Sequence, residues 1–250
     1  MILALLGGPI IGLLLGMLGG GGAILAIPLL IYGFSFSATQ ATAASLIIVG
    51  LGTLIGLISQ YAAGQVRLKE GLSFGLLGLI GSFVGSRLAS NIPDSLLLSG
   101  FAILTLVVAL TMISKLRSTR EYITRRPSIL AIALSATGVG FLTEFFGVGG
   151  GFAIVPALIF ALGFSMRQAS ATSLVVIAIN SAIAMGFRYS DLASIDWSVI
   201  SPIIITTVLG AFSGVKLAKK VKASSLQLGF AGFLIFISIY MGFQNFPDLF

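Results

Sequence analysis

Long runs of apolar residues follow one another along this 250-residue chain, and polar residues gather in the short stretches between them. Residues 97–113 and 230–241 are apolar almost throughout, without the strict apolar–polar alternation of a transmembrane barrel strand. Several runs approach the roughly 20 residues that a helix needs to cross a bilayer. A helix also bonds its backbone polar groups internally, as lipid demands. The pattern therefore predicts an all-α integral membrane protein.

The same pattern occurs twice, at an offset of 128 to 129 residues. Residues 36–46 (FSATQATAASL) and 164–174 (FSMRQASATSL) are identical at seven of eleven positions. Further along, 81–89 (GSFVGSRLA) matches 210–218 (GAFSGVKLA). Shared polar residues at a nearly constant spacing indicate a duplication rather than chance agreement. We divide the chain into an N-terminal repeat (1–114), a basic linker predicted to be cytoplasmic (115–127) and a C-terminal repeat (128–250).

Each copy holds four apolar segments, and the first of them is interrupted by glycines at 19–22 or at 147–151. An interior glycine costs a helix about 1 kcal/mol, and Pro28 and Pro156 weaken the halves that follow. We expect a Gly-broken re-entrant or hairpin helix plus about three transmembrane helices in each copy. We also expect the first segment to be retained rather than removed as a leader, because its counterpart lies mid-chain. The segments run over roughly 2–33, 38–60, 71–90 and 95–114, then 129–161, 166–187, 198–217 and 224–243.

The net charge of +7 lies in the stretches between apolar segments, which indicates membrane topology rather than nucleic-acid binding. If the first segment of each copy returns to its own side, only Arg87 and Arg188 of the 14 basic residues lie on the poorer side. The positive-inside rule favours that arrangement in a cell inner (plasma) membrane. Each copy then crosses an odd number of times. The second copy is therefore predicted to be inverted relative to the first, as in many secondary transporters.

The glycine breaks are the leading candidates for a binding site. Non-helical backbone at membrane depth is tolerated only against protein or a watery cavity, and the positive N-terminal end of a half-helix suits an anion. Close helix packing is the competing interpretation, and we prefer it for the isolated Gly12–Gly16 pair. The candidate residues are Gly21, Gly22, Gly149, Gly150 and Gly151.

A polar helix face follows each break and recurs in both copies. Carboxamides and hydroxyls on one face can hydrogen-bond an oxyanion without a fixed charge. Bonds between neighbouring helices explain the same residues individually. Because the face recurs, we predict that it lines a pore or pocket. The residues are Gln40, Thr42 and Ser45 in the first copy, and Gln168, Ser170, Thr172 and Ser173 in the second.

Three further residues are candidates for coupling or gating. Glu144 lies inside an apolar segment, three residues before the second break, where the first copy has Gly16. It could carry a proton that couples transport, or it could be a carboxylate in contact with water. Arg167 could attract an anion at the cytoplasmic mouth or sit at the interface as an ordinary anchor, and Asn180 is a weaker candidate. The chain has no Cys and no His, so we expect no metal site and no cofactor.

The glycine motifs resemble those of the TauE/SafE family of sulfite exporters. The resemblance rests on 147–156 (GVGGGFAIVP) followed by 171–174 (ATSL), and on 19–28 (GGGGAILAIP) in the first copy. Residues 43–46 (AASL) depart from the usual run, which weakens the case for a ligand contact at Ala44. The resemblance covers essentially the whole chain. It implies membrane transport, usually outward, of a small sulfur-containing anion such as sulfite or a sulfonate.

The residues alone favour a secondary transporter of a small anion that works by alternating access around a midplane site. A passive anion channel is the main alternative, and a membrane lipid-phosphate hydrolase is a weaker one because its clustered carboxylates or histidines are missing. We therefore expect no enzyme. No nucleotide-binding Gly-Lys-Ser/Thr sequence occurs, so ATP is not expected to drive this chain directly. The expected partners are a small anionic substrate and membrane lipid, and a homodimer is compatible with the small-residue faces.

Overall fold

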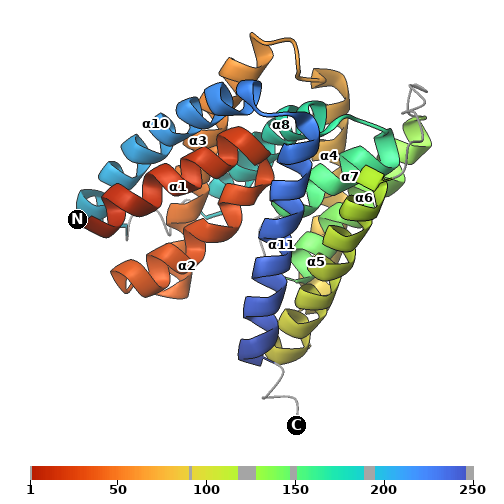
Figure 1. Ribbon diagram of the computed structural model, residues 1–250. Helices are drawn as coiled ribbons and strands as arrows, with labels where there is room; N and C mark the ends of the chain where they lie inside the picture. Colours follow the sequence, from red (N-terminus) through yellow and green to blue (C-terminus); the bar gives the residue numbers. More distant parts are fainter. Residues whose placement is uncertain (1, 90–91, 118–127, 147–150, 189–194, 246–250) are drawn as a thin grey trace.

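The computed structural model describes residues 2–89, 92–117, 128–146, 151–188 and 195–245, and within these ranges it is helical without strands (Figure 1). Six helices are long and apolar enough to cross a membrane. The two at the centre, α3 and α8, are 56% and 50% buried over their apolar windows, against 28–39% for the others. The six are α3 (Ala38–Tyr61), α4 (Leu68–Ala89), α5 (Asp94–Arg117), α8 (Met166–Phe187), α10 (Trp197–Lys220) and α11 (Ala223–Asn245).

The first predicted break is present at the first glycine run. Helix α1 (Ile2–Leu18) ends just before it, a 3₁₀ turn covers Gly20–Gly22, and α2 (Ala23–Phe34) begins after it. Gly19 has φ 75° and ψ −106°, a conformation that glycine adopts without a steric penalty. Figure 1 shows the chain reversing direction between α1 and α2. The glycine run therefore produces a helical hairpin.

The second copy is divided at the matching place. Helix α6 (Ile129–Phe145) ends before the second glycine run, and α7 (Gly151–Leu162) begins at its last residue. Gly149 and Gly150 lie outside the described residues. The ends of α2 and α7 also correspond, because Ser35 and Gly163 are both left-handed, with φ 57° and 69°. The duplicated sequence thus gives duplicated helix limits.

Helix α4 shows why these helices suit lipid. Its glycines are buried, whereas its large apolar side chains are exposed. In water this arrangement would be unfavourable, but a hydrocarbon solvent removes the penalty for exposing them, and the small residues then let neighbouring helices approach. The exposed set includes Leu72, Leu76, Ile80 and Phe83.

Glycines make the crossing between α1 and α10 very close. A side chain on Gly12 would overlap the Thr207 carbonyl, and one on Gly16 would overlap the Ala211 carbonyl. From the other side, a Cβ atom on Gly210 would lie 2.5 Å from the Pro9 carbonyl oxygen. The predicted packing role of Gly12 and Gly16 is confirmed.

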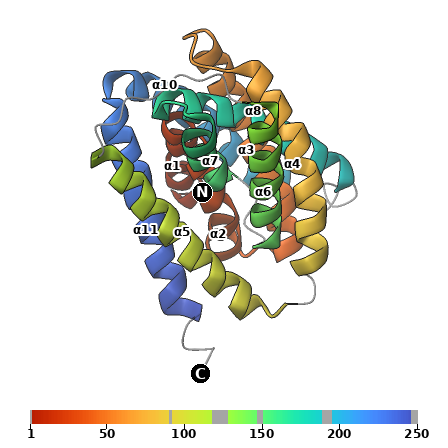
Figure 2. The ribbon, with the colours of Figure 1, turned by 90° about the vertical axis from the view of Figure 1, so that its right-hand side faces the viewer.

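The crossing between α4 and α6 repeats this contact at corresponding positions (Figure 2). A side chain on Gly140, the counterpart of Gly12, would overlap the carbonyl of Gly78, the counterpart of Thr207. A side chain on Gly81, the counterpart of Gly210, would overlap the Thr137 carbonyl. Each hairpin thus packs its first helix against the other copy, and α5 pairs with α11 across the copies.

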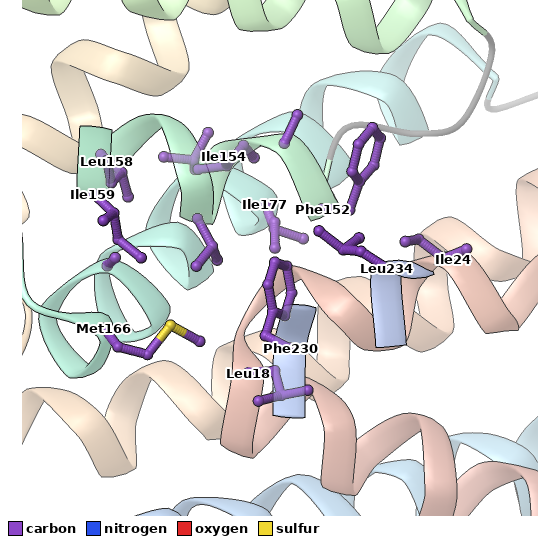
Figure 3. Close-up of a cluster of buried hydrophobic side chains, with 14 of the residues drawn as sticks. Leu18, Ile24, Phe152, Ile154, Leu158, Ile159, Met166, Ile177, Phe230 and Leu234 are labelled. Atoms are coloured by element: carbon purple, nitrogen blue, oxygen red, sulfur yellow. The ribbon is translucent and has the colours of Figure 1, made fainter. Parts of the chain in front are cut away.

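Buried apolar side chains from both copies form a common core beside the breaks (Figure 3). Phe152 of α7 packs edge-on against Phe101 of α5, with ring centroids 4.8 Å apart. Phe230 of α11 lies beside Leu18 at the end of α1. This core fixes the hairpins relative to the long helices and so positions the start of α7.

Candidate functional site

A cavity of about 100 Å³ lies where the two hairpins meet the central helices. Residues from α2, α3, α6, α7 and α8 line it, so both copies contribute. Its wall is mainly apolar, with a few polar groups converging on the space, which is the usual composition of a small-ligand site. The lining residues are Ala23, Ile27, Thr42, Ser45, Leu46, Val49, Glu144, Gly151, Ile154, Ile177, Asn180, Ser181 and Ala184.

The N-terminal ends of α2 and α7, the second helix of each hairpin, border this cavity. Ala23 begins α2 and Gly151 begins α7, and the two positions correspond at the 128-residue offset. No side chain caps the start of α2. The first-turn N–H groups of a helix carry its positive partial charge, which favours an anion nearby. Two such ends at one cavity can hold negative charge without a lysine or arginine in contact.

The hairpins touch each other at these starts. A Cβ atom on Gly151 would lie 2.7 Å from the carbonyl oxygen of Gly20, and one on Gly20 would overlap the backbone of Gly151. Both glycines are buried. Glycine is therefore needed at both positions so that the backbones can approach.

Two of the predicted hydroxyl residues, Thr42 and Ser45 of α3, face the cavity. They lie one helical turn apart, and the Ser45 hydroxyl donates to the Thr42 carbonyl at 2.8 Å. That bond keeps the Ser45 side chain folded back on its own helix, with its oxygen available as an acceptor. A hydroxyl can rotate to donate to a bound ligand instead.

Glu144 and Asn180 reach the same cavity from α6 and α8. The Asn180 Oδ1 atom is buried and has no hydrogen-bond partner among the described residues. Arg188, just after α8, is the basic group whose charge acts on Glu144. A carboxylate and a carboxamide oxygen favour a proton or cation rather than an anion. The cavity therefore combines these groups with helix starts that favour an anion.

The other first-copy candidates lie away from this cavity. A Cβ atom on Gly21 would contact Leu18 and Phe230 at 3.6 Å, and one on Gly22 would overlap the Ile11 carbonyl. Gln40 forms a capping box with Ser37 at the start of α3. These residues shape the hairpin and the helix start.

In the second copy, the predicted polar face surrounds the first break instead. The Ser170 hydroxyl donates to the Met17 carbonyl at 3.2 Å, and a side chain on Gly19 would overlap the Ser173 hydroxyl. The Thr172 hydroxyl accepts from the Arg67 N–H at 3.1 Å. Gln168 forms the second capping box, with Ser165. The face therefore connects the two copies rather than lining the described cavity.

Comparison with known proteins agrees with the family resemblance of the glycine motifs, and it covers nearly the whole chain. The model of the family described as "Sulfite exporter TauE/SafE" matches residues 4–241. The chain belongs to the TauE/SafE family. A "probable membrane transporter protein" of Xylella fastidiosa strain 9a5c is 32% identical, with 97% of this chain and 95% of the relative covered. The "probable membrane transporter protein YdhB" of Bacillus subtilis is 30% identical, over 83% and 86% of the two chains. No solved structure gives a significant match.

This TauE/SafE chain is thus a multi-pass transporter of the membrane, with six candidate spans in its described part. Sequence reasoning missed Ala23, Ser181 and the apolar lining, among them Ile154 and Ile177. Ala23 was detectable in principle as the counterpart of Gly151. Apolar positions within an apolar helix carry no signal of their own, because every face of such a helix looks alike in sequence.

Proposed function

We propose that the chain is a secondary transporter that exports a small sulfur-containing anion, such as sulfite or a sulfonate, across the inner membrane. The observation that carries this proposal is the placement of Ala23 and Gly151, the starts of α2 and α7, at one cavity. Helix starts of this kind attract negative charge. The sulfur chemistry and the outward direction come from the family, which is described as sulfite exporters.

The described wall of the cavity contains no lysine or arginine. An anion held by helix ends and hydroxyls alone is bound without a strong ion pair, so it can also leave quickly. Release matters for a carrier, since binding that is too tight would stop turnover. The proposed roles are electrostatic for the starts of α2 and α7, and hydrogen-bonding for Thr42 and Ser45.

We further propose that the two copies are inverted repeats that alternate access to this cavity. The support is the equivalence of the two crossings, in which Gly12 and Gly140 contact carbonyls at corresponding positions. Paired units of this kind can exchange conformations by rocking one unit against the other. The predicted charge distribution, with most basic residues on one side, fits the same topology.

The carboxyl group of Glu144 affects whether an anion can bind in this cavity. Two like charges about 4 Å apart repel by about 4 kcal/mol at an effective dielectric constant of about 20. A carboxylate that lines the cavity would therefore oppose an anion inside it. We propose that the anion occupies the cavity together with a proton on Glu144, so that binding strengthens as the pH falls.

Counterflow in liposomes tests the proposal. The full-length protein is reconstituted with unlabelled sulfite inside, and labelled sulfite is added outside. A carrier accumulates labelled sulfite transiently above equilibrium. Unlabelled methanesulfonate or sulfite added outside competes with the label and inhibits its uptake. A non-saturating flux without counterflow would support a passive channel and reject the carrier. No flux above that of protein-free liposomes for any sulfur anion would reject the substrate class.

A further inference from the structure

A second cavity of about 270 Å³ lies at the far ends of α3 and α8 from the first. None of its described lining residues lines the central cavity. Ser45 and Gln60, on the same helix, line the central and the second cavity, and 15 residues of helix separate them by about 22 Å. The two cavities are thus separate places. The lining residues of the second are Gln60, Ala63, Gln65, Arg167, Ala218 and Lys219.

Arg167 brings a positive charge to this second cavity. Its Nη2 atom donates to the Val221 carbonyl at 2.7 Å and to the Lys219 carbonyl at 3.5 Å. Both acceptors are neutral backbone groups at the end of α10. The Nε atom is buried and has no acceptor among the described residues. A buried donor without a partner is costly, so the guanidinium gains from a ligand oxygen that a small side-chain movement brings within reach.

Two more donors border the same space. The Lys219 side chain is exposed and lines the cavity beside Arg167. Gln60 is only 6% exposed and lines the same cavity. A carboxamide has two N–H donors that can serve a bound oxygen. The described lining contains no carboxylate that would compete for these donors.

This donor set belongs to one end of the molecule only. At the corresponding positions of the other copy, Arg188 replaces Gln60, Thr39 replaces Arg167 and Ser90 replaces Lys219. The duplication therefore does not explain the cluster. Its end of the molecule also carries Arg67 after α3, Lys220 at the last position of α10 and Lys222 just beyond it, which add positive potential.

We propose that the second cavity is a binding site for an oxyanion group of sulfur or phosphorus, held by Arg167, Lys219 and Gln60. The group could be a sulfite or sulfonate in solution, or the phosphate of an anionic lipid, since all present oxygens to a guanidinium and an ammonium. The site does not depend on the proposed transport function, because it is separate from the central cavity.

Calorimetric titration of the full-length protein in detergent tests the soluble source, with sulfite and inorganic phosphate as probes. The Arg167→Gln and Lys219→Gln variants should each bind about tenfold or more weakly, as expected when a charged hydrogen bond is lost. Lys220→Gln is the matched control, since Lys220 is an exposed neighbour outside the described lining, and it should bind within about twofold of the wild type. Because Arg167 also binds the end of α10, Lys219→Gln keeps the test valid if the arginine variant fails to fold.

Native mass spectrometry with added phosphatidylglycerol tests the lipid source. If the wild type retains the lipid, Lys219→Gln retains less of it and sulfite does not displace it, the site binds lipid phosphate. Displacement by sulfite would assign it to soluble anions. If both cavity variants bind sulfite, phosphate and phosphatidylglycerol like Lys220→Gln, the proposal is rejected. Thr42→Val, in the central cavity, should leave the binding of inorganic phosphate and phosphatidylglycerol unchanged, so the failure of one site is distinguishable from the failure of the other.

Discussion

The backbone of Gly20 lies directly against the backbone of Gly151, so that a Cβ atom on Gly151 would be 2.7 Å from the Gly20 carbonyl oxygen. Each residue belongs to the break of a different hairpin. Their contact lies at the edge of the central cavity, because Gly151 also lines it. The position of the starts of α2 and α7 relative to each other therefore depends on glycine at both positions.

Gly151→Ala should lower both stability and transport. Inserting a methyl group where backbone already lies costs about 1–3 kcal/mol, and it pushes the start of α7 away from α2. The measurement is the thermal midpoint of the purified protein together with sulfite counterflow. Gly138→Ala, in α6 of the same hairpin, is the control, since a Cβ atom there meets nothing within 4 Å. Equal behaviour of the two variants would show that the contact is unimportant.

Glu144→Gln should remove the pH dependence of anion binding. If one proton binds with each anion, the wild-type affinity should fall by up to about tenfold for each unit of rising pH above the carboxyl pKa. Methanesulfonate is the suitable ligand, because its own charge does not change in this range. The variant should keep the wild-type low-pH affinity at every pH. Glu70→Gln, at the start of α4, should retain the wild-type slope. A slope that survives in Glu144→Gln would contradict the coupling role.

Thr42→Val should weaken anion binding with little change in stability. The substitution keeps the shape of the side chain but removes the hydroxyl of a residue that lines the cavity, and one hydrogen bond contributes about 0.5–1.5 kcal/mol. We expect the sulfite concentration that half-saturates counterflow to rise about three- to tenfold. Thr111→Val is the control, because Thr111 is exposed on α5 and its hydroxyl donates to the Val108 carbonyl of its own helix. An unchanged affinity would place the bound anion elsewhere.

Gly12→Ala and Gly140→Ala should destabilise the protein by similar amounts. Both added methyl groups would overlap a backbone carbonyl, that of Thr207 in one crossing and of Gly78 in the other. A cost of about 1–3 kcal/mol is expected for each. Thermal unfolding in detergent measures it, with Gly232→Ala as a control whose Cβ atom meets nothing within 4 Å. A loss confined to one of the two crossings would contradict their equivalence.

The limits of the helices follow from local sequence. Glycine runs end α1 and separate α6 from α7, and the Ser37–Gln40 and Ser165–Gln168 boxes start α3 and α8. Backbone entropy and capping act over a few residues, so they can be read without knowing the fold. The same holds for length and hydropathy, which predicted the six long spans.

Which polar residues meet was decided only by tertiary packing. The pair Thr42 and Ser45 corresponds in sequence to the pair Ser170 and Ser173. The first pair lines the cavity, whereas the second pair contacts Met17 and Gly19. The rotation of a helix about its axis depends on contacts with helices distant in sequence. In helices whose surface is mostly apolar, the local pattern does not specify that rotation. The sequence alone therefore determined the spans, the breaks and the duplication. The close glycine crossings then determined that Glu144, Asn180 and the starts of α2 and α7 share one cavity.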